Sequence, residues 1–124
     1  MKHGMLQHVH LLCADLDAAV AFWVKGFGAA FVEFRTFGKD AGAVLDMKSA
    51  TQIYLRTSSA PNQSGAIDHV GICVDSIEES LKNLLTLPGV SVTREPFVSG
   101  TRLCAFIQNA DAVSIELMQP NYTS

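Results

Sequence analysis

The sequence has no apolar run that approaches the roughly 20 residues of a membrane-spanning helix. Its first eight residues also lack the long apolar core of a secretory signal. Positive charge is scarce, because 9 Lys and Arg stand against 12 Asp and Glu, which gives a formal net charge of −3. The sequence therefore offers no basic patch to nucleic acid or to an anionic membrane surface. We expect a partner that is a small molecule.

Cysteine is scarce as well. Cys13, Cys73 and Cys104 are an odd number, and each lies within an apolar run typical of a strand. This pattern does not suit a disulfide framework, so we expect small buried side chains in a reducing cytoplasm. The 124 residues, 48% of them hydrophobic, are enough for one domain with a sizeable core.

The chain repeats itself. Residues 6–13 (LQHVHLLC) are similar to residues 67–74 (IDHVGICV). Three pairs keep nearly one register: His8 with His69 and Gly28 with Gly89, both 61 positions apart (69 − 8 and 89 − 28), and Tyr54 with Glu116, 62 apart (116 − 54). A register held at three separate places indicates an internal repeat.

In the first half, a strand-like run over 7–13 precedes Asp15, which is a good helix N-cap. Apolar residues at helical spacing follow, and we expect Gly26 and Gly28 to stop this helix. Three further strand-like runs complete the half: 30–36, 42–47 and 51–56.

The second half repeats this order. Ser76 and Glu79 form a capping box at the start of an apolar helical stripe, and Pro88-Gly89 is expected to end that helix. The strand-like runs that follow are 90–94, 102–108 and 112–118.

The sequence therefore predicts an α+β fold of two tandem βαβββ modules. We expect the modules to form a curved mixed sheet around a concave site, with the helices on the outer face. The first module spans 1–58 and the second 66–124. The polar stretch 57–65, which contains Pro and Gly, is expected to link them within one structural domain.

Side chains alternate between the two faces of a strand. If Val9 and Leu11 face the helix of their half, His8 and His10 face the concave side. The same reasoning places His69 and Gly71 on the concave side of the fifth strand. It also places Glu116 and its repeat partner Tyr54 there. A two-fold relation between the modules would bring together His8, His69, Tyr54 and Glu116.

Two imidazoles and one carboxylate suit a divalent metal ion such as zinc, nickel, iron, cobalt or manganese, and they leave coordination positions open. An open site can polarise a substrate carbonyl or acidify a bound water molecule. Glu116 lies in an otherwise apolar strand, where a carboxylate without a partner is costly to bury. The sequence therefore predicts a metal site formed by His8, His69 and Glu116.

Each of these residues has a simpler interpretation. A single His in a strand is more often a hydrogen-bonded core or surface residue, and Glu116 can be a solvated residue on an exposed sheet face. His10 is either an acid or base beside the site or a polar residue lining a wet cavity. Arg102 either binds an anionic substrate or is a solvated strand residue.

At these residues the sequence resembles the vicinal oxygen chelate superfamily, and within it the small bacterial glyoxalase I proteins. The resemblance rests on five segments: 8–16 (HVHLLCADL), 68–75 (DHVGICVD), 92–96 (VTREP), 101–106 (TRLCAF) and 115–117 (IEL). It spans nearly the whole chain, and the second half is the better match. The superfamily includes isomerases, lyases, ring-cleaving dioxygenases, antibiotic-inactivating transferases and metal-free binding proteins.

The resemblance implies that His8, His69 and Glu116 are metal ligands. Tyr54 stands where glyoxalase I has its fourth ligand, a glutamate, and a neutral phenol is a poor ligand for a hard divalent ion. Two His and one Glu are also the facial triad of extradiol dioxygenases and the metal set of fosfomycin-resistance transferases. The dioxygenase signature expects a Tyr and an Asp-Pro-x-Gly turn, whereas residues 106–112 read FIQNADA.

The function implied by the resemblance is a metal-dependent glyoxalase-like enzyme, an isomerase or lyase, that acts on a small metabolite chelated through vicinal oxygens. The expected catalytic residues are Glu116, Tyr54 and His10, and the expected substrate contacts are Tyr54, His10 and Arg102. Two alternatives stay open: an extradiol-type ring-cleaving dioxygenase, and a metal-free protein that binds a small molecule or an antibiotic. Short members pair as homodimers, so His8 of one chain would join His69 and Glu116 of the other.

Overall fold

In the computed structural model, the described residues are 6–59, 67 and 69–123. The chain divides into two compact units, Met1–Pro61 and Asn62–Ser124, which we call the first and the second module. Most of the expected linker, namely residues 60–65, lies outside the described residues. Thr57, which was expected to begin the linker, is the last residue of a strand in the first module.

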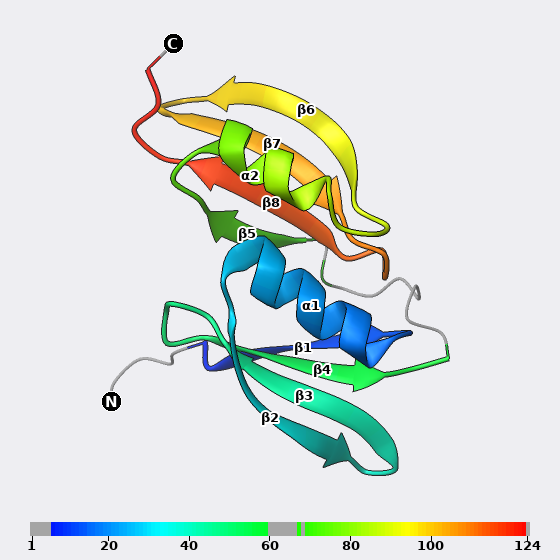
Figure 1. The fold of residues 1–124 in the computed structure, drawn as a ribbon. Coiled ribbons are helices and arrows are strands. Elements are labelled where there is room, and N and C mark those ends of the chain that lie inside the picture. The colour runs from blue at the N-terminus through cyan, green and yellow to red at the C-terminus, as the bar shows by residue number, and fades with distance from the viewer. Residues whose placement is uncertain (1–5, 60–66, 68, 124) are drawn as a thin grey trace. The chain divides into compact units, whose positions relative to one another are not determined.

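The first module has the elements β1 (His8–Cys13), α1 (Leu16–Phe27), β2 (Ala30–Phe37), β3 (Asp40–Asp46) and β4 (Gln52–Thr57). Its four strands form one sheet in the order β1-β4-β3-β2, with α1 on one face (Figure 1). β1 runs parallel to β4, and the other neighbouring strands are antiparallel. Chain order and spatial order thus differ, because β1 and β4 are the first and last strands of the module.

The second module has the same arrangement. Its elements are β5 (Val70–Cys73), α2 (Ile77–Leu84), β6 (Ser91–Ser99), β7 (Arg102–Gln108) and β8 (Ser114–Gln119). The strand order is β5-β8-β7-β6, and β5 runs parallel to β8 (Figure 1). The predicted α+β fold of two tandem βαβββ modules is therefore confirmed.

The start of α1 agrees with the sequence, and its end needs a correction. The Asp15 carboxylate accepts a hydrogen bond from the backbone N–H of Ala18 at 3.0 Å, which makes Asp15 the N-cap. Gly26 lies inside the helix, although we expected it to stop the helix. Gly28 alone ends α1, because it adopts a left-handed backbone (φ 70°) and its N–H bonds to the Val24 carbonyl. A single internal Gly costs a helix only about 1 kcal/mol, so the capping geometry decides where the helix ends.

The end of α2 is also corrected. Ser76 caps its start, where the hydroxyl accepts a hydrogen bond from the Glu79 N–H at 3.2 Å. The helix ends at Leu84, whereas we expected it to continue to Pro88-Gly89. A tighter turn follows the helix, in which the Thr86 N–H and hydroxyl both donate to the carbonyl of Asn83, three residues earlier.

The helix-covered face of each sheet holds the buried apolar side chains. Ile53 and Leu55 on β4 are at most 2% exposed, and Ile115 and Leu117 on β8 are fully buried. Burying one such side chain contributes about 1.5–3 kcal/mol. Between them, Tyr54 and Glu116 face the opposite side of their own sheets and are half-buried. This is the alternation that the sequence predicts.

His69 precedes β5, whose first paired residue is Val70. We expected His69 to lie within the fifth strand, but this strand begins one residue later, at Val70. Among the residues that the structure describes, no helix is long and apolar enough to cross a membrane.

The Asp15 cap gives a stability prediction. Asp15→Ala leaves the first N–H groups of α1 without their side-chain acceptor and should lower the free energy of unfolding by about 1 kcal/mol. Chemical denaturation followed by circular dichroism measures this change. Asp17→Ala removes a first-turn carboxylate that is not the cap, so it should cost clearly less. An equal loss in both variants would contradict the capping role.

Candidate functional site

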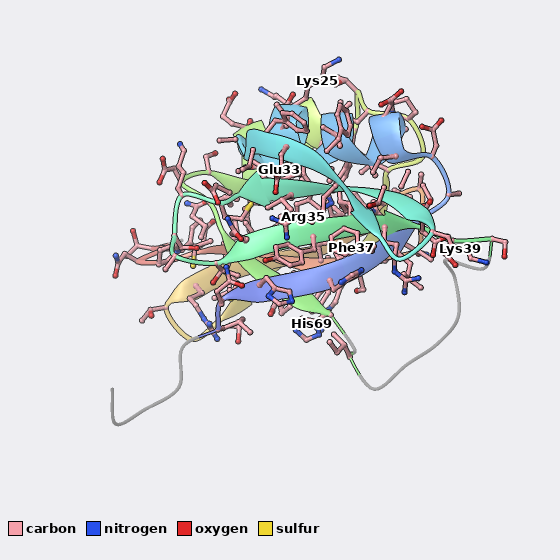
Figure 2. All side chains as sticks on the ribbon, turned by 90° about the horizontal axis from the view of Figure 1, so that it is seen from below. Lys25, Glu33, Arg35, Phe37, Lys39 and His69 are labelled. Atoms are coloured by element: carbon pink, nitrogen blue, oxygen red, sulfur yellow. The ribbon has the colours of Figure 1, made fainter. Side chains whose placement is uncertain are left out.

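A cluster of His and aromatic side chains lies on the open face of the first module. The rings of His8 and Tyr54 stack with centroids 4.0 Å apart and an angle of 9° between their planes. The His10 ring meets Phe37 edge-on at 4.8 Å and Tyr54 at 6.1 Å. The strand register explains the cluster, because His10 on β1 lies directly beside Tyr54 on β4. Figure 2 shows Phe37 and Arg35, which both extend from β2.

Glycine makes room for this cluster. A Cβ atom at Gly42 on β3 would lie 2.4 Å from the Phe37 ring and 2.5 Å from the Leu55 carbonyl oxygen. Gly42 therefore lets the Phe37 ring lie close against the sheet, next to His10.

Arginine residues surround the same cluster. The Arg56 Nε donates a hydrogen bond to His10 Nε2 at 3.3 Å, and Arg56 also pairs with Asp40 at 3.1 Å. The guanidinium of Arg35 lies over the Tyr54 ring, 5.4 Å from its centroid. Partial burial lowers the pKa of His10 below its ordinary value of 6.5, and the positive charge of Arg56 and the neighbouring His8 lower it further. His10 is therefore neutral at pH 7, with its proton on Nδ1, because Nε2 accepts from Arg56.

The stacking of Tyr54 on His8 decides whether both side chains could bind the same metal ion. A metal ion bound to His8 Nε2 would lie near the plane of the imidazole ring. Stacked rings stay about 3.5–4 Å apart, and the phenol oxygen lies in the plane of its own ring. A metal–oxygen bond of about 2.0–2.2 Å is too short to cross that gap. In this arrangement the Tyr54 hydroxyl cannot share an ion with His8.

The open face of the second module holds a His–carboxylate pair. His69 Nε2 lies 3.4 Å from Glu116 Oε1, and the two side chains are 34% and 20% exposed. Glu116 on β8 is paired with Gly71 on β5, which has no side chain to cover the carboxylate. The His69 and Phe106 rings meet edge-on with centroids 5.3 Å apart, and Phe106 on β7 is paired with Glu116 on β8. These contacts hold His69 and Glu116 together at one place on the sheet.

Two arginines and a second aromatic pair lie on the second module. The rings of Phe97 and Phe106 are parallel with centroids 6.4 Å apart, and the guanidinium of Arg94 lies 3.6 Å from the Phe97 centroid. Arg102 donates to the sulfur of Met118 at 3.4 Å, and a thioether is only a weak acceptor. Its guanidinium thus has capacity left for an anion, while its predicted contact with substrate stays a prediction.

The structure thus brings the predicted site residues together in two groups. His8, His10 and Tyr54 form one group in the first module, and His69 and Glu116 form another in the second. The repeat is visible at the site, because His8 touches Tyr54 as its counterpart His69 touches Glu116. Within neither module do the described residues gather three His, Cys, Asp or Glu side chains that could hold a metal ion. The three-ligand set that draws on both modules stays a prediction.

Sequence reasoning found no role for several residues of these groups. By alternation along β4, Gln52 and Arg56 lie on the same face as Tyr54, and this alternation was a usable signal for both. Sequence reasoning missed Phe37, Phe97 and Arg94. Irregular pairing on β6, with register shifts on both sides of Arg94, hides Phe97 from a simple alternation argument.

No protein-family model matches the sequence. Two curated relatives, both named probable lactoylglutathione lyase, match over nearly their whole length. The protein from Vibrio parahaemolyticus serotype O3:K6 is 27% identical in an alignment 139 positions long, which covers 100% of this chain and 96% of that protein. The protein from Vibrio cholerae serotype O1 is 26% identical in an alignment 134 positions long, which covers 96% of this chain and 93% of that protein.

Solved structures show the same fold. A glyoxylase/bleomycin resistance protein/dioxygenase domain from Frankia sp. EAN1pec has a TM-score of 0.79 at 17% identity, covering 96% of this chain and 99% of its own. TnmS3, an antibiotic binding protein from Streptomyces sp. CB03234, has a TM-score of 0.77 at 19% identity, covering 97% and 98%. Together with the two relatives, these structures confirm the resemblance that the sequence motifs indicate.

The environment of His10 gives a prediction. Arg56→Gln removes a positive charge beside the imidazole, so the pKa of His10 should rise toward its ordinary value of 6.5. Burial, the larger cause, remains, so the rise should be partial. The folded state disfavours protonated His10, so stability is complete above about pH 6.5 and is lost as the pH falls through the lowered pKa. This acid-side loss should be smaller in the variant.

An NMR titration of the histidine ring protons in metal-free protein measures the His10 pKa directly. Lys48→Gln removes an exposed positive charge elsewhere and should leave the His10 pKa unchanged. A His10 pKa that stays the same or falls in Arg56→Gln would show that the contact with Arg56 does not set it.

Proposed function

We propose that this chain is a metal-dependent lyase or isomerase, because it resembles vicinal oxygen chelate proteins in its motifs and fold and is similar over its full length to two proteins named probable lactoylglutathione lyase. Its substrate would be a small metabolite that presents two neighbouring oxygen atoms to the metal. One observation carries this proposal: His69 and Glu116 present donor atoms 3.4 Å apart on an open sheet face. The name shared by the two Vibrio relatives, lactoylglutathione lyase, supports lyase chemistry.

The spacing of these donor atoms fits one metal ion. Zinc binds imidazole nitrogen and carboxylate oxygen at about 2.0–2.2 Å, so two ligands at a tetrahedral angle lie about 3.4 Å apart. His69 Nε2 and Glu116 Oε1 lie at this separation without an ion between them. The third proposed ligand is His8, whose Nδ1 faces the Gln7 side chain at 2.7 Å and leaves Nε2 for the metal. The donor set, two neutral nitrogens and one carboxylate, suits Zn, Ni, Fe, Co or Mn.

A bound ion would supply Lewis acidity to the substrate oxygens, and the protein would supply orientation and proton transfer. Glu116 is the carboxylate at the site and the base that can accept a proton from the substrate. Tyr54 fixes the plane of the His8 ring by stacking. His10 is neutral and can donate an Nδ1–H to a substrate oxygen, because Arg56 holds its other nitrogen. Arg102 would bind an anionic part of the substrate.

Metal stoichiometry tests this proposal. Metal-free protein, incubated in turn with each of the five ions and then desalted, should retain close to one ion per chain. His8→Ala, His69→Ala and Glu116→Ala should each lower metal affinity by at least tenfold, because each removes one of three protein ligands. Elemental mass spectrometry measures the content, and the loaded protein should then be assayed for lactoylglutathione formation.

Glu78→Ala is the matched control, since it removes an exposed carboxylate of α2 and should leave metal content unchanged. Circular dichroism separates lost binding from lost folding. Full metal occupancy in folded His69→Ala and Glu116→Ala proteins would refute the ligand assignment.

We further propose a cytoplasmic homodimer in which each metal site is shared between chains, as the resemblance implies. A heterodimer of His8→Ala and Glu116→Ala chains should then keep one intact site of its two, and so roughly half the wild-type metal content. Differently tagged chains, co-expressed and purified through both tags, provide the sample. If each site lay within one chain, both sites of this heterodimer would lack a ligand and the metal content would not recover.

A second candidate function, binding of an apolar ligand, is supported by the aromatic side chains beside the histidines of both modules. Phe37 and Tyr54 flank His10 in the first module. In the second module Phe106 meets His69, and the Phe97 ring lies parallel to that of Phe106. Such faces suit a planar apolar ligand, and TnmS3 is named an antibiotic binding protein. Retained affinity of metal-free protein for an aromatic antibiotic such as bleomycin, with no uptake of any of the five ions, would favour sequestration over catalysis.

A further inference from the structure

A chain of three side chains leads from a carboxylate to His8. His8 Nδ1 lies 2.7 Å from Gln7 Oε1, and Gln7 Nε2 donates to Gln52 Oε1 at 2.9 Å. Gln52 Nε2 then donates to Asp46 Oδ1 at 2.6 Å.

The sheet register builds this chain. His8 on β1 is paired with Gln52 on β4, and Gln52 is paired with Asp46 on β3, so the three residues form one row across three strands. Gln7 precedes β1 and is held there, because its carbonyl accepts the Gln52 backbone N–H at 2.7 Å. Because Gln7 lies outside β1, the alternation of side chains along the strand does not fix the direction of its side chain, which turns toward His8.

The carboxylate gives the chain a direction. An ionised carboxylate only accepts hydrogen bonds, so Asp46 requires the NH₂ group of Gln52 on its side. The Gln52 oxygen then faces Gln7 and requires the NH₂ group of that residue. The Gln7 oxygen is left facing His8, where it accepts a hydrogen bond. The ring nitrogen opposite an acceptor must carry the proton.

We infer that Gln7, Gln52 and Asp46 are positioning residues that hold neutral His8 in the Nδ1–H tautomer, with the lone pair on Nε2. Tyr54, stacked on the same ring, fixes its plane, so tautomer and plane are set by separate contacts. Partners of this kind orient metal-binding histidines, and their loss typically costs about 10–100-fold in metal affinity. The purpose of the tautomer rests on the proposed function, whereas the tautomer itself is a property of the metal-free protein.

The second module does not repeat this row. The residues at the repeat positions of Gln52 and Asp46 are Ser114 and Gln108, each 62 positions further along and paired with one another. A hydroxyl and an amide both donate and accept, so this pair imposes no direction. Among the described residues, the row that ends in a carboxylate therefore lies beside His8, while His69 lies 3.4 Å from the Glu116 carboxylate.

Long-range ¹H–¹⁵N NMR of histidine-labelled, metal-free protein at about pH 8 tests the inference. The His8 nitrogens should show the pattern of a protonated Nδ1 and an unprotonated Nε2. Asp46→Asn keeps the size of the side chain but removes the acceptor-only end, so the His8 signals should move toward a mixture of tautomers. Gln7→Leu should shift them further toward Nε2–H, and Gln7→Glu, which restores an acceptor, should restore the Nδ1–H pattern.

Asp40→Asn is the matched control, because Asp40 lies on the same strand but pairs with Arg56. It should leave the His8 signals unchanged. A wild-type His8 that is mainly Nε2–H, or an unchanged pattern in folded Asp46→Asn and Gln7→Leu proteins, would overturn the inference. Metal titration of the same samples should show affinity weakened by about tenfold, the low end of the range, because these bonds are exposed to water. Wild-type protein with the Nδ1–H pattern that binds no metal would refute the proposed function and leave the positioning role standing.

Discussion

The parallel pairing of the first and last strands of each module is the constraint on which the site depends. It places His10 beside Tyr54 in the first module and Gly71 beside Glu116 in the second. The helix covers one face of each sheet, so the polar residues of these strands share the other face. In each module, the His at or just before the start of the first strand contacts the third residue of the last strand. His8 contacts Tyr54 on β4, and His69 contacts Glu116 on β8. One backbone arrangement, used twice, thus gives one aromatic–imidazole pair and one carboxylate–imidazole pair.

The difference between the two pairs decides their chemistry. Glu116 brings a negative charge to His69 at a separation that suits two ligands of one ion. Tyr54 brings no charge to His8, and its stacked hydroxyl lies out of reach of an ion in the imidazole plane. In the proposed site, the first module would supply the nitrogen of His8, held by the Tyr54 ring and by the row that ends at the Asp46 carboxylate. The second module would supply the nitrogen of His69 and the carboxylate of Glu116. A neutral His10 beside Arg56 adds a hydrogen-bond donor rather than a second base.

Much of this could be predicted from the sequence, because the repeat and the alternation of side chains along strands act together. They placed Tyr54 and Glu116 on the faces opposite the buried Ile and Leu residues, as the structure has them. Features that follow no period could not be predicted. Gln7 lies before its strand, so alternation does not define its side chain, and the irregular pairing of β6 moves Phe97 out of the expected register. The ends of the helices depend on local capping, which is why Gly26 lies within α1 and Gly28 ends it.

We propose that His8, His69 and Glu116 hold one ion. Anomalous diffraction at the absorption edge of the metal, from crystals of zinc-loaded protein, would locate that ion. We expect one anomalous peak for each chain, about 2.0–2.2 Å from the Nε2 atoms of both histidines and from a Glu116 oxygen. A peak bound by residues of one module alone, or a zinc-loaded crystal in which His8 does not reach the ion, would contradict it.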